Sequence, residues 1–301
     1  MSLRPGPAFL WVKQKFGNGL KVAWYRDVVR PKILHTEPTP DTFDNACEIH
    51  VLTSNTDWLN LIWTLKSFYR VSERRYRLCI HEDGSLDDEA LFWLRQHFPA
   101  ARLVRRKEAD LRLAHVLRDY RLSLKFRNSN LLAPKVFDFM AFLESDRMAV
   151  FDSDLLFFSK PSSYIERIEC KAYQVNTFNT DVGNGYTVEP SEVRARIGHD
   201  LVPRINSGLG LVHRDSIRWD WTEEFLALPK ILDGNPWRIE QTLFALCSSR
   251  YGIEHLPDEY AISLESGFKK RPFRHYVGKI RHLMYSEGMA HLAKEGFLRA
   301  A

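Results

Sequence analysis

The chain has 301 residues, of which 45% are hydrophobic and 13% aromatic, so it can bury a sizeable core and is not disordered over most of its length. The 43 basic and 38 acidic residues leave a formal net charge of +5, an excess too small to indicate nucleic acid as a partner. This length fits one large α/β domain or two closely joined halves.

The cysteines and the hydropathy of the chain bear on its cellular compartment. The four cysteines are widely spaced and form no CxxC pair, which argues against a zinc site built on thiolates and favours a reducing compartment. No apolar run approaches the ~18 residues that would span a bilayer, and residues 1–7 have no signal-peptide pattern. We therefore expect a cytoplasmic protein. The cysteines are Cys47, Cys79, Cys170 and Cys247.

Residues 1–45 differ in composition from the rest of the chain. Aromatic residues alternate there with lysines and arginines, and Pro38 and Pro40 mark a linker-like stretch. One interpretation is a basic, aromatic segment that lies peripherally on a membrane surface. The other is an N-terminal arm that packs on the domain formed by residues 46–301.

The apolar spacing after the arm predicts strands and helices in alternation. Strands are expected over 49–53, 76–80, 101–104 and 148–151, and helices over 58–69, 87–98 and 134–143. Such an order predicts an α/β protein with a doubly wound, mostly parallel sheet.

The triplet Asp152-Ser153-Asp154 directly follows the apolar strand predicted over 148–151. Ligands of open α/β sheets bind at the carboxyl ends of the strands, and two carboxylates one residue apart can converge there on one divalent cation. Charge that interrupts an apolar segment is costly unless it is used or paired. The alternative is an ordinary strand-end turn with solvated acids.

Two further motifs follow downstream. Asn206-Ser207-Gly208 stands directly before an apolar strand, where Gly208 would permit a sugar to approach closely and Asn206 would hydrogen-bond its hydroxyls. A plain turn that enters a strand is the alternative. Glu240 and Gln241 open a helix with a buried apolar face, and by itself Glu240 reads as an acid at a helix start.

The last motif combines an imidazole, a glycine and cationic side chains in a short span: His275, Gly278 and Arg281. This chemistry suits a metal together with a diphosphate, although by itself the segment reads as a basic surface loop.

Taken in order, these features resemble the glycosyltransferases of the GT-A type, and most closely their retaining, glycogenin-like branch. The resemblance extends over roughly residues 48–285. It implies the GT-A fold, in which a Rossmann-like nucleotide-binding half is fused to an acceptor half. It also implies that Asp152, Asp154 and His275 hold a manganese or magnesium ion.

The resemblance further implies roles for the other motif residues. Asn206 and Glu240 or Gln241 would face the transferred sugar and form the catalytic set. The donor site would include the basic residue before the DxD strand, the rest of the Asn-Ser-Gly motif and the late basic element: Lys135, Ser207, Gly208, Gly278 and Arg281.

The match departs from the glycogenin-like pattern in places. Arg281 stands where that pattern prefers lysine, and Glu240 replaces the usual aspartate.

The turn that contains Asp83 resembles instead the "DDGSxD" element of a large inverting family, which implies that Asp83, with Thr53 at the end of the first strand, contacts the nucleoside. The mechanism is left open, with retention favoured; in an inverting reaction Glu240 would be the general base.

The expected function is therefore transfer of a sugar from a nucleotide-diphosphate donor, with UDP as the expected nucleotide, to a glycan, lipid or protein acceptor. A non-catalytic module of the same fold that binds nucleotide or scaffolds an assembly is the main alternative. A phosphatase of the DxD type is a weaker alternative, because Leu155 and Leu156 follow the triplet where that motif has other residues.

Overall fold

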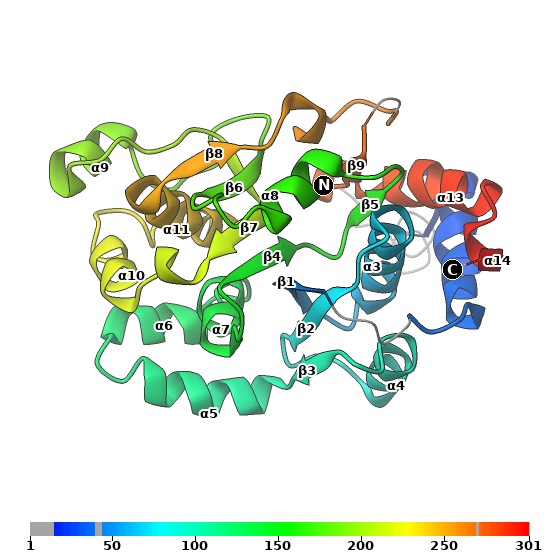
Figure 1. The fold of residues 1–301 in the computed structure, drawn as a ribbon, viewed down its shortest axis with the longest axis horizontal. Helices are drawn as coiled ribbons and strands as arrows, with labels where there is room; N and C mark the ends of the chain where they lie inside the picture. Colours follow the sequence, from blue (N-terminus) through cyan, green and yellow to red (C-terminus); the bar gives the residue numbers. More distant parts are fainter. Residues whose placement is uncertain (1–14, 40–43, 269–270, 301) are drawn as a thin grey trace, which may run out of the picture.

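The computed structural model describes residues 15–39, 44–268 and 271–300. A seven-stranded sheet in the order β3-β2-β1-β4-β7-β6-β8 runs through the centre of the molecule, with helices on both faces (Figure 1). A second, two-stranded sheet pairs β5 with β9. The strands are β1 Asp44–Thr53, β2 Tyr76–Glu82, β3 Arg102–Val104, β4 Arg147–Phe151, β5 Leu155–Phe157, β6 Asn176–Thr180, β7 Ile205–His213, β8 Ile253–His255 and β9 Phe273–His275.

The predicted α/β fold with a mostly parallel sheet is confirmed. Strand β1 is parallel to β2 and β4, β2 is parallel to β3, and β6 is parallel to β8. Strand β7 is the exception, because it runs antiparallel to both of its neighbours, β4 and β6. Phe151, the last residue of β4, pairs with Leu209, so the first residues of β7 extend past the carboxyl end of β4.

Side chains of β1 alternate between two apolar layers, as expected for a strand that is covered on both faces. Ile49 and Val51 belong to the core that includes residues of α3, α4 and α8. His50 points the other way and contacts Phe139 of α7. The helices after the arm and before the C-terminal segment are α3 Trp58–Ser72, α4 Asp88–His97, α5 Arg106–Val116, α6 Arg121–Ser129, α7 Pro134–Phe142, α8 Ser162–Glu169, α9 Pro190–Ile197, α10 Trp219–Leu226 and α11 Pro236–Tyr251.

Local sequence signals explain where two of these helices begin, and two strands are longer than predicted. Asp87 caps α4 by accepting a hydrogen bond from the Ala90 backbone N–H at 2.9 Å, and Pro134 is the first residue of α7, where its missing N–H costs nothing. Strand β1 begins before the predicted start, at Asp44. Strand β2 continues through Glu82, so His81 belongs to the strand rather than to the turn.

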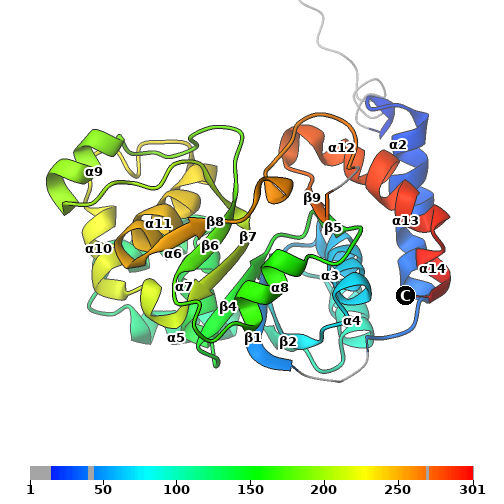
Figure 2. The ribbon, with the colours of Figure 1, turned by 45° about the horizontal axis from the view of Figure 1, so that its top comes forward.

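The described part of the arm forms helical turns that pack beside the C-terminal helices, as both views show (Figures 1 and 2). Ile33 is fully buried, and the indole N–H of Trp63 on α3 donates to the carbonyl oxygen of Arg30 at 3.0 Å. These contacts join the arm to the main domain. The elements of the arm are α2 Leu20–Trp24, η1 Tyr25–Val29 and η2 Arg30–His35. The C-terminal elements are η5 Gly278–Ile280, α12 Arg281–Leu283, η6 Met284–Met289, α13 Ala290–Lys294 and α14 Phe297–Ala300.

Over the residues that the structure describes, each helix is too short or too polar to cross a lipid bilayer.

Candidate active site

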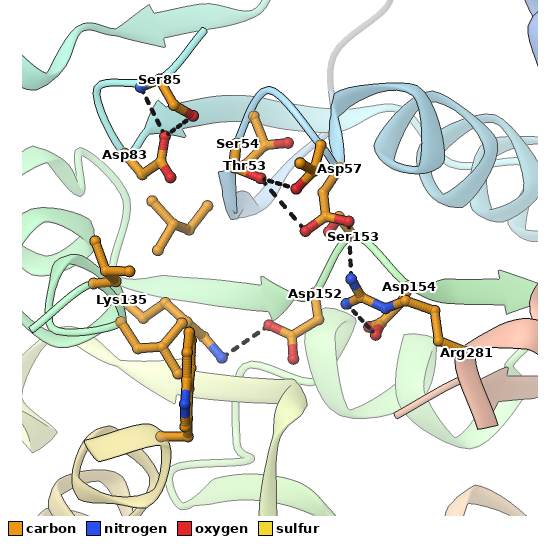
Figure 3. Close-up of a pocket in the computed structure, with 15 residues that line it drawn as sticks. Thr53, Ser54, Asp57, Asp83, Ser85, Lys135, Asp152, Ser153, Asp154 and Arg281 are labelled. Atoms are coloured by element: carbon orange, nitrogen blue, oxygen red, sulfur yellow. Dashed lines mark hydrogen bonds and ion pairs between the residues drawn. The ribbon is translucent and has the colours of Figure 1, made fainter. Parts of the chain in front are cut away.

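A cleft of about 520 Å³ lies at the carboxyl ends of β1, β2 and β4 (Figure 3). Three strand-end segments contribute polar groups to it, and α7, α11 and α12 contribute one or more side chains each. Its lining consists of Leu52, Thr53, Ser54, Thr56, Asp57, Asp83, Ser85, Leu131, Leu132, Lys135, Asp152, Ser153, Asp154, Trp237 and Arg281.

Two carboxylates and one imidazole converge at the end of β4. The His275 Nε2 atom is 3.0 Å from Asp154 Oδ1 and 3.6 Å from Asp152 Oδ2. This meeting follows from the antiparallel pairing of β5 with β9, which sets Leu155 opposite His275. The two carboxylates and the imidazole of the predicted metal site are therefore close enough to share one cation.

Asn206 and Gly208 determine how His275 is oriented. The Asn206 side-chain oxygen lies 2.9 Å from His275 Nδ1 and accepts the hydrogen of that nitrogen, which leaves Nε2 facing the carboxylates. Asn206 is in turn held by Asp181, to which its amide donates at 3.1 Å. A methyl group on Gly208 would lie 2.2 Å from His275 Cε1 and 2.9 Å from Asp152 Oδ2. The glycine therefore makes room for the imidazole and the carboxylate.

A buried ion-pair network lies behind the carboxylates. The Lys135 ammonium group is 2.8 Å from Asp152 Oδ1 and 3.0 Å from Glu240 Oε1. The Ser207 hydroxyl donates to Glu240 Oε2 at 3.1 Å, and the Ser207 N–H donates to Gln241 Oε1 at 3.4 Å. Lys135 and Glu240 are almost fully buried, with exposed fractions of 3% and 1%. The catalytic candidates Glu240 and Gln241 therefore contact other site residues.

Arg281 closes the other side of the carboxylate cluster (Figure 3). Its guanidinium donates to Asp154 Oδ2 at 2.7 Å and to Asp57 Oδ1 at 2.9 Å. Arg281 is the first residue of α12, directly after the turn that Gly278 opens. A methyl group on Gly278 would meet nothing within 4 Å, so packing within the described chain does not require a glycine there.

The nucleoside candidates Thr53 and Asp83 both line the cleft. The Thr53 hydroxyl is buried and has no hydrogen-bond partner among the described residues. One Asp83 oxygen accepts hydrogen bonds from the Ser85 N–H at 2.9 Å and from the Ser85 hydroxyl at 2.5 Å. Asp83 thus shapes its turn and also presents a carboxylate to the cleft.

Sequence reasoning missed several residues of this site. Asp57 pairs with Arg281, Asp181 orients Asn206, and the exposed Trp237 stands at the start of α11 on the wall of the cleft. Asp57 directly precedes α3 at the end of the loop after β1, a place where ligand-binding residues of α/β proteins gather. The position of Asp57 in this loop is the one sequence signal that could have identified it as a site residue, because binding residues are concentrated in such loops.

Burial and the opposite charges of neighbouring side chains together set the pKa values of Asp154, His275 and Glu240. Burial disfavours the ionised form of Asp154, but the charges of His275 and Arg281 outweigh burial and hold the pKa of this carboxyl below its usual range. Burial alone would lower the pKa of His275, and Asp154 raises it. The pKa of Glu240 is raised by burial, against the opposing charge of Lys135.

The fold is similar to that of solved glycosyltransferases. Mouse xyloside xylosyltransferase 1, in its apo form, matches with a TM-score of 0.50 and 12% identity over 78% of this chain and 98% of that chain. The bifunctional glycosyltransferase WbbM, also in its apo form, matches with a TM-score of 0.51 and 11% identity over 87% of this chain and 53% of that chain. The chain therefore has the GT-A fold.

Comparisons of sequence give no such match. No protein-family model matches the chain, and no curated protein matches it. The likeness is one of fold, and the assignment to the glycogenin-like branch stays a prediction.

We expect Lys135→Met to destabilise the metal-free protein by about 3–5 kcal/mol near pH ~8, because it leaves the buried Glu240 and its neighbour Asp152 without their cation. The pKa of Glu240 is already raised and rises further without the ammonium group. Because the unfolded chain then releases a proton that the folded chain keeps, stability falls as pH rises through and above the ordinary carboxyl pKa, and the loss is smaller near pH ~5.

Urea unfolding in the presence of a chelator at both pH values measures this effect. The double variant Lys135→Met/Glu240→Gln is the control, and it should recover part of the lost stability because the stranded charge is gone. An equal loss at both pH values, or full additivity of the two substitutions, would contradict the buried-charge explanation.

Proposed function

We propose that this protein is a metal-dependent glycosyltransferase that moves a sugar from a nucleotide-diphosphate donor to an acceptor hydroxyl. The observation that carries the proposal is the convergence of Asp152, Asp154 and His275 beside the cleft, with Lys135 and Arg281 bordering the same carboxylates. The GT-A fold, shared with solved glycosyltransferases, supports the same reaction class.

The donor set suits a manganese or magnesium ion. Two carboxylates and one neutral imidazole nitrogen are ligands that such cations accept, and Asn206 leaves the nitrogen of His275 that faces the carboxylates available for coordination. When bound, the cation supplies positive charge to the diphosphate and to the leaving nucleotide. The chain itself provides the two carboxylates at the end of β4 and the orientation of the imidazole.

The remaining residues would hold the donor in the cleft. Arg281 presents a planar guanidinium beside the metal site, and such a group binds phosphate oxygens through paired hydrogen bonds. Gly278 opens the turn before it and would let the diphosphate approach the backbone. Thr53 and Asp83 would take the ribose or the base, with UDP as the proposed nucleotide. The position of Lys135 beside Asp152 supports a contact to the donor sugar.

The surroundings of Glu240 support a retaining reaction. A general base must have a free carboxylate oxygen within reach of the acceptor hydroxyl. In this protein one Glu240 oxygen is paired with Lys135, the other accepts from Ser207, and the residue is 1% exposed and lies outside the lining of the cleft. We propose that Glu240 positions Lys135 and Ser207 instead of moving a proton.

Retention of the anomeric configuration of the transferred sugar has a direct test. Once a donor is identified, slow transfer of its sugar to water should first release the anomer with the configuration of the donor, which proton NMR distinguishes before mutarotation. Release of the opposite anomer would assign an inverting reaction and return Glu240 to the role of a general base.

We predict that nucleotide diphosphates and their sugars raise the melting temperature only when manganese or magnesium is present. Asp154→Asn removes one negative ligand at nearly constant shape, and Gly208→Ala displaces His275 and Asp152; each should weaken Mn²⁺ binding about 10-fold or more. Gly183→Ala is the matched control, because its added methyl group meets nothing within 4 Å.

Electron paramagnetic resonance of free Mn²⁺ reports binding without any assay of turnover. Full Mn²⁺ affinity in a folded Asp154→Asn protein would remove the carboxylate from the metal site. Metal-dependent donor binding without any turnover would instead support the non-catalytic module.

We also propose that the arm contacts an anionic membrane surface, with a lipid, glycan or protein acceptor nearby and the enzyme on the cytoplasmic side. Leu20, Trp24 and Val28 follow one another at a spacing of four and are exposed by 76%, 56% and 40%. Exposed lysines, Lys21 and Lys32, flank this apolar row. An apolar row flanked by cations is the pattern of helices that lie in a lipid interface.

Vesicle flotation tests this contact. With vesicles that contain phosphatidylglycerol, the double variant Leu20→Gln/Trp24→Gln should bind at least about 10-fold more weakly than the unchanged protein, because two apolar side chains no longer enter the lipid. Leu111→Gln in α5, where the leucine is 78% exposed, is the matched control. Equal binding by all three proteins would retire the membrane contact.

A further inference from the structure

A second cluster of metal-ligating side chains lies away from the cleft, between the central sheet and α7. His50 on β1 pairs in register with Cys79 on β2, and His81 stands two residues further along β2, so all three side chains point to the same face. They are 0%, 1% and 1% exposed. Phe139 of α7 covers both imidazoles, with ring centroids 5.4 Å from His50 and 4.7 Å from His81.

The ligand atoms of this cluster are spaced like those of a metal site. His81 Nε2 is 3.0 Å from His50 Nδ1 and 3.2 Å from Cys79 Sγ. Around a tetrahedral zinc ion with ordinary bond lengths, nitrogen and sulfur ligands are separated by about 3.3–3.6 Å. An outward movement of a few tenths of an ångström would therefore make room for a cation among atoms that already converge.

Hydrogen bonds alone do not satisfy the cluster. A ring nitrogen carries either one hydrogen or one lone pair in the ring plane, so His81 Nε2 cannot make a good hydrogen bond to both His50 and Cys79. Coordination by one cation would instead use the three converging atoms, His50 Nδ1, Cys79 Sγ and His81 Nε2, together. The outer nitrogens of the two rings, His50 Nε2 and His81 Nδ1, point away from the cluster and are not among these ligand atoms.

A carboxylate stands behind the cluster. Glu48 Oε2 is 3.5 Å from His50 Nε2, the ring nitrogen that points away from Cys79 and His81. A carboxylate that attracts the hydrogen of the outer nitrogen leaves the lone pair of the inner nitrogen directed at the cluster. This arrangement of carboxylate, histidine and metal is common around bound cations.

We propose that His50, Cys79 and His81 form a buried binding site for one thiophilic cation, of the zinc or cuprous class. A thiolate with two imidazoles selects such ions over magnesium or manganese. This part of the described chain offers three ligand side chains at the cluster, which suits a three-coordinate cuprous ion or a zinc ion with one small additional ligand.

The consequence lies in the strands that the cation would join. Thr53 follows His50 by three residues on β1, and Asp83 follows His81 by two residues after β2. Both residues line the cleft. A cation that ties β1 to β2 would fix the separation of these two strand ends, which makes the site structural and independent of whether the cleft transfers sugars.

Cobalt spectroscopy tests the proposal on the full chain in a Cys170→Ser background, which removes the exposed thiol. After treatment with a chelator, equimolar Co²⁺ should produce the near-ultraviolet band of a thiolate-to-cobalt charge transfer, and Zn²⁺ should remove it. The cluster of Asp152, Asp154 and His275 contains no thiol and cannot produce this band. Cys79→Ser should abolish the band, whereas Cys47→Ser, a matched control at an equally buried cysteine of β1, should keep it.

Two further measurements need no substitution of Cys79 and therefore do not depend on the folding of Cys79→Ser. Zinc-edge X-ray absorption of the zinc-loaded Cys170→Ser protein should show a sulfur neighbour, and anaerobic titration with Cu⁺ against a competing chelator should show equimolar retention if the cuprous ion is the occupant. A zinc shell without sulfur, together with no charge-transfer band and no retained Cu⁺ in folded protein, would overturn the site.

Discussion

The neutralisation of buried negative charge is the constraint on which the candidate active site depends. Asp152, Asp154 and Glu240 lie together at the edge of an apolar sheet, and three cationic groups reach them from other elements: Lys135 from α7, His275 from β9 and Arg281 from α12. Asp154 and Glu240 are buried, and without such partners each would cost several kcal/mol, whereas Asp152 is partly exposed. The requirement for charge balance therefore holds these helices and strands around the end of β4.

The same network explains how the site can exchange partners. Each cation of the network contacts a carboxylate oxygen. A bound metal ion would compete with these cations for the carboxylates, and a diphosphate would compete with the carboxylates for the guanidinium of Arg281. Asn206 and Gly208 act one layer behind by orienting His275 and giving it room. The buried residues beneath the cleft consequently serve its geometry, while Thr53, Asp83 and Arg281 face the space that a ligand would fill.

Local patterns were sufficient for much of the fold. Apolar alternation located β1, a continuous apolar run located β4, the acids after Gly84 located the start of α4, and Pro134 located the start of α7. Such signals lie within a few residues of the element they specify, so one sequence carries them in full. The reversed direction of β7 was not readable in this way, because strand pairing joins residues that are far apart in the chain.

The alternation of strands and helices, and the placement of Asp152 and Asp154 after a buried strand, are readable from the sequence alone. The folded chain was needed to see that Gly208 makes room for His275 and that Arg281 reaches Asp154 across 127 positions of the chain. It also brought His50 beside Cys79 and His81, although the spacing of the cysteines had argued against thiolate zinc sites. The physical reason is that helix and strand periodicity are local properties, whereas a ligand cluster is set by the register between strands and by the packing of helices on the sheet.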